Sequence, residues 1–296
     1  MKNIIVIVGP TGVGKTKLSI ELAKKYNGEI INADAMQIYR GLDIGTAKIT
    51  EGEKEGIPHY LFDIKDVCDS YSIYDYQIEA REKIQDIMAR GKTPIMVGGT
   101  GLYIKACLYD YKLRKEDSNE TFDDVSTEEL YKKLLELDSD VDIDKNNRRR
   151  IIRAINYYKV NHESISNNKT NKLLYDALFI GLTTDRNILY DKINKRVDSM
   201  IRNGLLEEVE SFYLNNIYSK PLVSGIGYKE LYDYFNGKLS LDEAVELIKK
   251  NSRHYAKRQY TFFNNQLPVI WFDTNYDNFQ ETVDRVIKYI DGNEYK

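Results

Sequence analysis

Short apolar runs alternate with amphipathic segments through the first hundred residues. The run 3–8 is almost continuously β-branched, which is typical of a buried strand, and 29–32 and 94–97 are shorter runs of the same kind. Between them, 17–26 and 72–90 place apolar residues at helical spacing. We therefore predict an α/β fold with a mainly parallel sheet covered by helices.

The middle of the chain has a different pattern. Residues 112–172 contain neither glycine nor proline, and the best helical segments there are 128–137 and 148–159. A polar stretch at 161–171 predicts a loop, and the strand pattern resumes only at Asp176. The simplest interpretation is a helical insertion domain.

The last third returns to alternating elements. Strands are expected at 178–182 and 269–272, and helices at 189–203 and 241–263. The α/β core domain would then consist of 1–111 and 173–296, including the C-terminal helices, and the insertion domain of 112–172.

Composition narrows the class of protein. A chain of 296 residues with 42% hydrophobic residues is too apolar to be disordered, and no stretch approaches the roughly 18 uncharged apolar residues of a membrane span. Cys68 and Cys107 are too few for a disulfide framework or a four-ligand zinc site. We expect a cytoplasmic monomer with no membrane partner. The net charge of −3 does not exclude a local basic groove.

The segment after the first strand is a phosphate-binding loop, or P-loop. GPTGVGKT fits G-x-x-x-x-G-K-[ST] between a strand and a helix, so the core should resemble P-loop NTPases. Its amides would bind phosphate oxygens, its lysine would add a cation, and its threonine hydroxyl would bind Mg²⁺. The predicted diphosphate-binding residues are Gly9, Pro10, Thr11, Gly12, Val13, Gly14, Lys15 and Thr16. The motif alone leaves kinase, NTPase and transferase open.

Other polar residues follow the remaining strands. Ligands in open α/β sheets bind beyond the carboxyl ends of the strands, so the P-loop, Asp34, Thr100 and Arg186 should share one cleft. Asp34 is a candidate for a catalytic or metal-linked role. The strand 94–97 ends in glycines rather than in the acidic residue of a P-loop hydrolase, which favours group transfer.

Two basic clusters contain no acidic residue. They comprise Lys145, Arg148, Arg149, Arg150, Arg153 and Lys159 in the first case, and Lys249, Lys250, Arg253, Lys257 and Arg258 in the second. Such segregation on an acidic chain indicates a local polyanion site. Solvated helix faces paired with nearby acids explain it equally well.

The motifs, taken in order, resemble those of the bacterial tRNA dimethylallyltransferases, also called tRNA isopentenyltransferases. Only the P-loop is specific by itself, but the joint order is very specific. The matching segments extend almost end to end: Gly9–Thr16, Asp34–Arg40, Ile44–Lys48, His59–Asp63, Gly98–Tyr103, Asn147–Arg153, Arg196 with Gly204 and Leu205, Gly225–Glu230, and Arg253–Thr261.

The resemblance implies transfer of the dimethylallyl group of dimethylallyl diphosphate to N6 of an adenosine in tRNA, with release of diphosphate and assistance from Mg²⁺. The adenosine would be position 37, next to the anticodon on its 3′ side, in tRNAs that read codons beginning with U. Prenylation of free AMP or ATP, a small-molecule kinase and a non-catalytic RNA-binding protein are the alternatives. The insertion and the basic clusters favour tRNA, whose target base must leave its stack.

The same resemblance implies residue roles. Asp34 would accept the N6 proton, Thr16 would bind magnesium, and Arg196 would stabilise the leaving diphosphate. Gln37 could pair with the adenine edge. The expected tRNA-binding residues are Asp34, Ala35, Met36, Gln37, Thr100, Arg148, Arg149, Arg150, Arg153, Arg253, Lys257 and Arg258.

Three positions depart from the family pattern, of which Phe262, in place of a tryptophan, is a mild change. Ala35 replaces a serine, so a hydroxyl next to Asp34 is missing. Lys192 replaces the first arginine of an Arg-x-x-x-Arg pair that ends at Arg196. A lysine cannot form the planar two-pronged contact that an arginine makes with phosphate.

Overall fold

The computed structural model describes residues 4–111, 113 and 120–292. The chain forms two compact units, one of residues 1–107 and 175–296 and one of residues 108–174. The smaller unit begins four residues before and ends two residues after the expected insertion 112–172. No helix in the described residues is both long and apolar enough to cross a bilayer.

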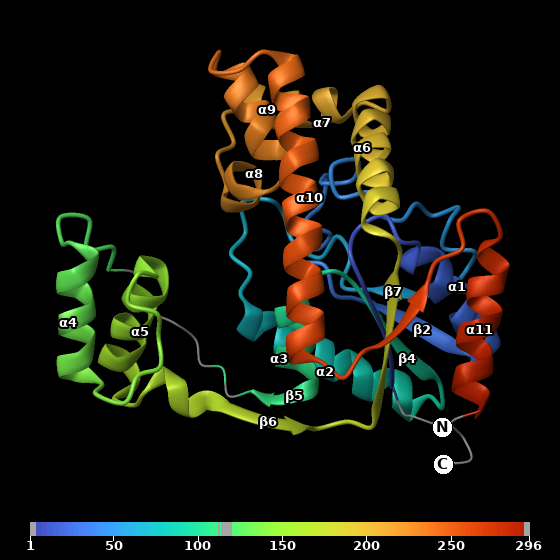
Figure 1. The fold of residues 1–296 in the computed structure, drawn as a ribbon, viewed down its shortest axis with the longest axis horizontal. Helices are drawn as coiled ribbons and strands as arrows, with labels where there is room; N and C mark the ends of the chain where they lie inside the picture. The colour runs from blue at the N-terminus through green and yellow to red at the C-terminus, as the bar shows by residue number, and fades with distance from the viewer. Residues whose placement is uncertain (1–3, 112, 114–119, 293–296) are drawn as a thin grey trace. The chain divides into compact units, whose positions relative to one another are not determined.

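A six-stranded parallel sheet forms the centre of the larger unit (Figure 1). The strand order is β3-β2-β4-β1-β7-β8. All five residues of β1 are buried, as expected for a strand covered on both faces. The predicted α/β class is confirmed. The strands are β1 (Ile4–Val8), β2 (Gly28–Asn32), β3 (His59–Tyr60), β4 (Thr93–Val97), β7 (Ala177–Thr183) and β8 (Ile270–Asp273).

Helices cover both faces of this sheet. On one face, Leu18 and Leu22 of α1 share a core cluster with Val283 and Val286 of α11. On α2, Gln77 Nε2 donates to the Ala106 carbonyl at the end of α3 (2.6 Å). The helices are α1 (Lys15–Lys25), α2 (Ile73–Ala89), α3 (Gly101–Leu108), α6 (Arg186–Arg202), α7 (Leu205–Leu214), α8 (Lys220–Ser224), α9 (Tyr228–Phe235), α10 (Leu241–Gln266) and α11 (Phe279–Gly292).

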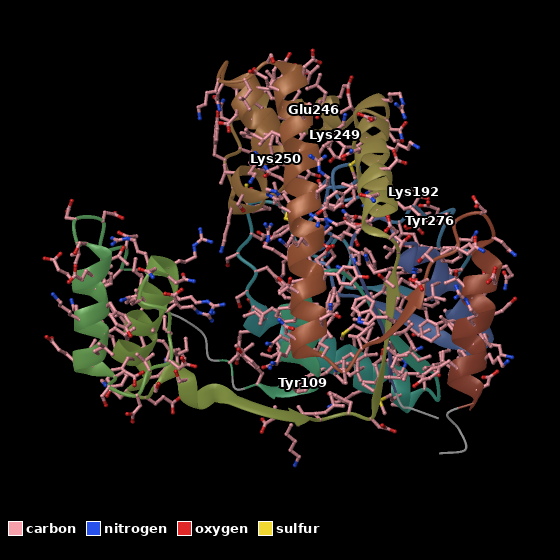
Figure 2. The ribbon with its side chains drawn as sticks, viewed as in Figure 1. Tyr109, Lys192, Glu246, Lys249, Lys250 and Tyr276 are labelled. Atoms are coloured by element: carbon pink, nitrogen blue, oxygen red, sulfur yellow. The ribbon has the colours of Figure 1, made fainter. Side chains whose placement is uncertain are left out.

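The long helix α10 packs against α6 and α9. Its Lys249 forms ion pairs of 2.8 Å with Asp198 on α6 and with Glu246 one turn earlier (Figure 2). This cation of the second basic cluster is therefore paired with acids. α10 begins at a capping box, in which Ser240 and Glu243 bond each other's backbone amides, and this explains why its start is visible in the sequence.

The smaller unit is built on a helical hairpin. Leu130 and Leu134 of α4 (Thr127–Leu137) pack with Ile151 and Ile155 of α5 (Arg148–Asn161). The expected loop at 161–171 is wrong in part, because η1 (Ile165–Asn168) and β6 (Lys169–Leu173) occupy much of it. β6 pairs antiparallel with β5 (Tyr109–Tyr111). The sequence of β6, KTNKL, has no apolar alternation, so no local signal predicts this strand.

A buried carboxylate fixes the edge of the sheet. Glu29 in β2 is 1% exposed and accepts hydrogen bonds from Arg90 (2.6 and 2.7 Å), Lys92 (2.6 Å) and the Tyr60 hydroxyl (2.8 Å). The hydrogen bond from Arg90 is the main cause that lowers the Glu29 pKa to about 2, against the effect of burial. This network joins β2 and β3 to the turn between α2 and β4.

Replacing Glu29 with glutamine should lower the free energy of unfolding by about 2 kcal/mol at neutral pH, because two partly exposed cations lose their buried partner. The Glu29 pKa rises from about 2 in the folded chain toward 4.5 on unfolding, so the unfolded chain binds more protons between these values. The carboxylate's contribution is therefore complete above about 4.5 and is lost as the pH falls toward 2.

Urea unfolding of the wild type and Glu29→Gln between about pH 3 and pH 7 measures this difference. The difference in free energy of unfolding between the two proteins should become smaller as the pH falls. Glu82→Gln, an exposed change on α2, is the matched control and should alter stability little at any pH. A gap that stays constant across the range would contradict the assignment.

Candidate active site

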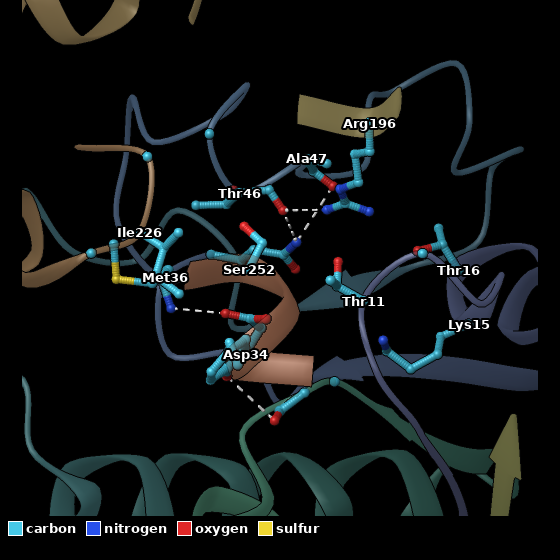
Figure 3. A pocket seen from close by; sticks show the side chains of 18 of the residues that line it. Thr11, Lys15, Thr16, Asp34, Met36, Thr46, Ala47, Arg196, Ile226 and Ser252 are labelled. Carbon is cyan, nitrogen blue, oxygen red and sulfur yellow. Dashed lines mark hydrogen bonds between the residues drawn. The ribbon is translucent and has the colours of Figure 1, made fainter. Parts of the chain in front are cut away.

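A cavity of about 560 Å³ lies at the carboxyl edge of the sheet, within the size range of small-molecule sites. It is lined by the P-loop, the ends of β2 and β4, the loop 45–49, α6, the segment 224–228 and α10 (Figure 3). Polar residues and apolar residues both contribute to its wall. The apolar contributors include Met36, Ile193, Val197, Met200, Ile226 and Ile248.

Glycines give the P-loop its shape. Gly9 has φ +140°, and a Cβ there would lie 2.5 Å from the Leu182 carbonyl oxygen. Gly14 has φ +91°, and a Cβ there would lie 2.5 Å from the Phe279 ring. Gly14 caps α1 without a side-chain hydrogen bond, so the first amides of the helix remain available to an anion.

Two cations occupy the cavity wall. Lys15 Nζ donates to the Pro10 carbonyl (2.8 Å), and Arg196 Nη2 donates to the Thr46 carbonyl (3.3 Å). Burial lowers the pKa of both side chains, and the neighbouring Arg196 lowers the pKa of Lys15 further, to about 8, while Asp34 opposes both shifts. A bound polyanion would stabilise both charged forms, so this end of the cavity is suited to a diphosphate.

Asp34 is held rigidly at the end of β2. The fully buried Asn32 accepts from the Asp34 amide (2.8 Å) and donates to the Asp34 carbonyl (3.0 Å) and the Leu61 carbonyl (2.9 Å). The Met36 amide donates to Asp34 Oδ1 (3.0 Å), as Figure 3 shows. The carboxylate therefore has a fixed direction in the same cavity as Lys15.

The turn after β4 is packed against both neighbours. A Cβ on Gly98 would lie 2.2 Å from the Ala33 carbonyl oxygen, and one on Gly99 would lie 2.1 Å from Gln259 Nε2. Gln259, on α10, donates to the Gly99 carbonyl (3.0 Å) and accepts from the Thr11 amide (3.3 Å). Gln259 therefore joins this turn to the P-loop.

Sequence analysis missed Gln259 and Asn32 as site residues. Gln259 lies within the matching segment Arg253–Thr261, of which only the cations were considered. Asn32 stands two residues before Asp34, the spacing of an Asx turn, and that signal was present in the sequence.

The structure brings ten of the expected residues to one cavity. Thr11, Gly12, Gly14, Lys15, Thr16, Asp34, Met36, Gln37, Arg196 and Arg258 line it. Gly9, Pro10, Val13, Ala35 and Thr100 do not line it. Two of them contact each other, because the Thr100 hydroxyl accepts from the Ala35 amide (3.0 Å), and the Pro10 carbonyl accepts from the lining residue Lys15 (2.8 Å).

The expectation that Arg186 shares the cleft is wrong. It does not line the cavity, and its guanidinium lies 5.1 Å from the centre of the Tyr190 ring. The cause is local, because Asp185 caps α6 and leaves Arg186 exposed in the first turn of that helix.

The arginines of the basic clusters differ in their surroundings. Arg148 donates to the Val125 carbonyl (2.5 Å) and the Phe122 carbonyl (2.6 Å), which fixes the loop before α4. Arg253 donates to Asn194 Oδ1 (2.6 Å) on α6. Among the expected tRNA-binding cations, Arg149, Arg150, Arg153, Lys257 and Arg258 are exposed.

Comparison with known proteins identifies the family of this chain. Residues 37–266 match the family model described as IPP transferase. This chain belongs to the IPP transferase family. A relative from Geobacillus thermodenitrificans named tRNA dimethylallyltransferase is 50% identical over 98% of this chain and 97% of its own. The resemblance inferred from the motifs is confirmed, and with it the transferase class.

Solved structures of the family share the fold. The full-length tRNA isopentenylpyrophosphate transferase of Bacillus halodurans is 41% identical, with a TM-score of 0.77 over 99% of this chain and 96% of that chain. A structure described as a eukaryotic dimethylallyltransferase acting on tRNA is 29% identical, with a TM-score of 0.84 over 99% and 80% of the two chains.

Binding of inorganic pyrophosphate should depend on the charge of Lys15. Because the Lys15 pKa is lowered to about 8, the affinity should fall as the pH rises through that value. A bound anion raises this pKa, so binding near pH 8 should take up a proton. Calorimetry in buffers of different ionisation heat, between about pH 7 and pH 9.5, measures both effects.

Lys15→Met should bind more weakly and should lose this part of the pH dependence. Subtracting the pH profile of Lys15→Met from that of the wild type cancels the titration of pyrophosphate itself, which is the same for both proteins. Lys25→Met changes an exposed lysine of the same helix and should match the wild type. Equal pH profiles for the wild type and Lys15→Met would refute the role of Lys15.

Proposed function

We propose that this chain transfers the dimethylallyl group of dimethylallyl diphosphate to the exocyclic N6 of an adenosine in tRNA and releases diphosphate. The observation that carries the proposal is the single cavity that holds a phosphate cradle with two cations and, beside them, the fixed carboxylate of Asp34. The relatives' names support tRNA as the acceptor in preference to free AMP or ATP.

The acceptor nitrogen needs a base. The lone pair of an adenine amino group is delocalised into the ring, so N6 becomes nucleophilic only as its proton is removed. Asp34 is the group proposed to accept this proton, because its carboxylate lines the cavity and is held by the contacts with Asn32 and Met36. The N6–carbon bond forms while the allylic carbon–oxygen bond breaks, and the electron pair leaves with the diphosphate.

The leaving group gains negative charge. Lys15, Arg196 and the first amides of α1 stabilise that charge, and they are in place before the reaction, which is how preorganised donors lower a barrier. The apolar wall that includes Val197, Ile226 and Ile248 would hold the prenyl chain and exclude water from the allylic carbon.

The residues fit a magnesium ion shared with substrate. The described residues include no group of three or more His, Cys, Asp or Glu that could hold a metal. Mg²⁺ commonly takes few protein ligands and completes its shell with phosphate oxygens and water. The Thr16 hydroxyl, with the diphosphate, would hold the ion, which would neutralise part of the leaving-group charge.

The acceptor base must be extruded from the anticodon loop to reach N6, at a cost of a few kcal/mol. Exposed arginines of α5 and the exposed Lys257 and Arg258 would bind the RNA phosphates and offset that cost. The resemblance identifies the base as adenosine 37 of tRNAs that read codons beginning with U, and tRNA as a substrate implies a cytoplasmic reaction.

Transfer of labelled prenyl to an anticodon stem-loop tests the proposal. The purified protein with dimethylallyl diphosphate and Mg²⁺ should label a stem-loop that has adenosine at the 3′ side of the anticodon. Nucleoside analysis should find the label on N6 of that adenosine. Labelling of AMP without labelling of the RNA would establish the alternative acceptor.

Asp34→Asn should lower turnover by about 10²-fold or more, the usual contribution of a general base. The amide is isosteric and can still accept from the Met36 amide, so RNA binding should persist. Asp191→Asn removes an exposed carboxylate on α6 and is the control with normal turnover. Unchanged turnover in Asp34→Asn would remove Asp34 from the mechanism.

The double variant Arg149→Ala, Arg153→Ala should bind the stem-loop more weakly and with a flatter dependence on salt. With fewer phosphates contacted, binding releases fewer counterions from the RNA. Binding titrations at several salt concentrations measure the slope. Lys132→Ala, on the exposed face of α4, should leave the slope unchanged. A normal slope in the double variant would assign these arginines to the fold alone.

A further inference from the structure

One main-chain carbonyl in the cavity wall orients two of the proposed functional side chains. The Thr46 carbonyl accepts from Arg196 Nη2 (3.3 Å), as Figure 3 shows. It also accepts from Gln37 Nε2 (3.1 Å). Gly45, Thr46 and Ala47 all line the cavity. The position of this loop therefore determines where the guanidinium and the carboxamide point.

A carboxylate from α7 holds the loop in place. Glu208 Oε2 accepts from the amides of Asp43 (3.0 Å) and Ile44 (2.6 Å), and Oε1 accepts from the amide of Gly45 (3.1 Å). Three consecutive amides therefore converge on one carboxylate, an arrangement that backbone nests use to bind anions. Glu208 itself does not line the cavity.

Tyr228 completes the set of donors. Its fully buried side chain donates to Glu208 Oε1 (2.6 Å). A Cβ on Gly45 would lie 2.6 Å from the Tyr228 hydroxyl oxygen, so the loop approaches as closely as a glycine allows. Four donors converge on Glu208, two on each oxygen.

Lys48 anchors the far side of the same loop by a second network, which shares Asp43 with the first. Its Nζ, on a side chain that is 5% exposed, donates to the Tyr39 carbonyl (2.8 Å) and to the carboxylates of Asp43 (2.7 Å) and Asp63 (2.5 Å). The stretch between these anchors carries the Thr46 carbonyl. Loss of Glu208 would therefore release that carbonyl without unfolding the whole loop.

We propose that Glu208 is a positioning residue for the transfer reaction: it fixes the Thr46 carbonyl and, through it, the Arg196 guanidinium that faces the leaving diphosphate. The inference rests on the proposed function for the role of Arg196. Glu208 accepts from the amides of residues 43–45, and the carbonyl of the next residue, Thr46, accepts from Arg196.

Only a carboxylate of this length satisfies all four donors. Each ionised oxygen accepts two hydrogen bonds, whereas a glutamine would turn an NH₂ group toward two of the donors. An aspartate would be shorter by one methylene and would withdraw from the loop. Glu208→Gln is therefore an isosteric change that disturbs the loop without opening a cavity.

The experiment compares Glu208→Gln with the wild type in two assays that do not depend on each other. In the transfer assay, kcat should fall about 10- to 100-fold, the scale of effect that remote misplacement of a catalytic group produces. In calorimetry, the affinity for inorganic pyrophosphate should fall about 10-fold as Arg196 loses its orientation. In the Arg196→Ala background, Glu208→Gln should have almost no further effect on either quantity.

The control is Glu207→Gln, which removes the same charge from the same turn of α7 at an exposed position, and it should match the wild type. A Glu208→Gln protein that melts earlier but keeps the wild-type kcat and pyrophosphate affinity would overturn the proposal. Effects of Glu208→Gln and Arg196→Ala that multiply would also overturn it. Absence of transfer by the wild type would refute the proposed function, while the pyrophosphate assay would still test the positioning role.

Discussion

The confinement of Lys15 and Arg196 within one cavity wall is the constraint on which the site depends. Burial disfavours both charges, and each cation is placed against a main-chain carbonyl that only partly replaces water. The protein therefore carries an electrostatic cost that an anion removes. Ligand binding and stability are coupled for the same reason, since any anion that binds only the folded chain stabilises it.

Three buried or half-buried polar side chains keep the reacting groups in place around this pair. Asn32 fixes the direction of Asp34, Gln259 joins the P-loop to the turn after β4, and Glu208 holds the loop that contacts Arg196. Each makes two or more hydrogen bonds to backbone groups of other residues. Sites supported in this way keep their geometry because the loops cannot move independently.

The sequence predicts the part of this site that is local. The strand, the P-loop and the start of α1 follow each other directly, so glycine spacing and apolar pattern identify them together. Asp34 is found by the rule for strand ends. Gln259 and Glu208 are not found, since their partners lie between 160 and 248 residues away in sequence and no period connects them. The pairing of β5 with β6 is hidden for the same reason.

Local pattern also fails to separate neighbours within a cluster. Arg148 and Arg149 are equivalent by composition, but the helix turns them by about 100° relative to each other, as 3.6 residues per turn require. Arg148 consequently reaches the carbonyls before α4, and Arg149 faces solvent. The same distinction separates Lys249, which pairs with Asp198 and Glu246, from Lys257, which is exposed.

Two of the three departures from the family pattern, Ala35 and Lys192, lie where the structure uses something other than the missing group. At Ala35 the backbone amide, not the side chain, makes the contact with Thr100. Lys192 Nζ lies 4.4 Å from the centre of the Tyr276 ring, outside the residues that line the cavity (Figure 2). Tyr276 in turn donates to the Gly12 carbonyl (3.2 Å), and Thr274 donates to the Val13 carbonyl (3.0 Å).

Those two hydroxyls donate to P-loop carbonyls. A carbonyl oxygen that pointed at a bound phosphate would repel it. The segment after β8 therefore engages the carbonyls of Gly12 and Val13, while Lys15 lines the cavity. A lysine is sufficient at position 192 for this purpose, because a cation over an aromatic face needs no planar fork. In the proposed function, the C-terminal segment would therefore assist diphosphate binding by holding the P-loop through its Gly12 and Val13 carbonyls.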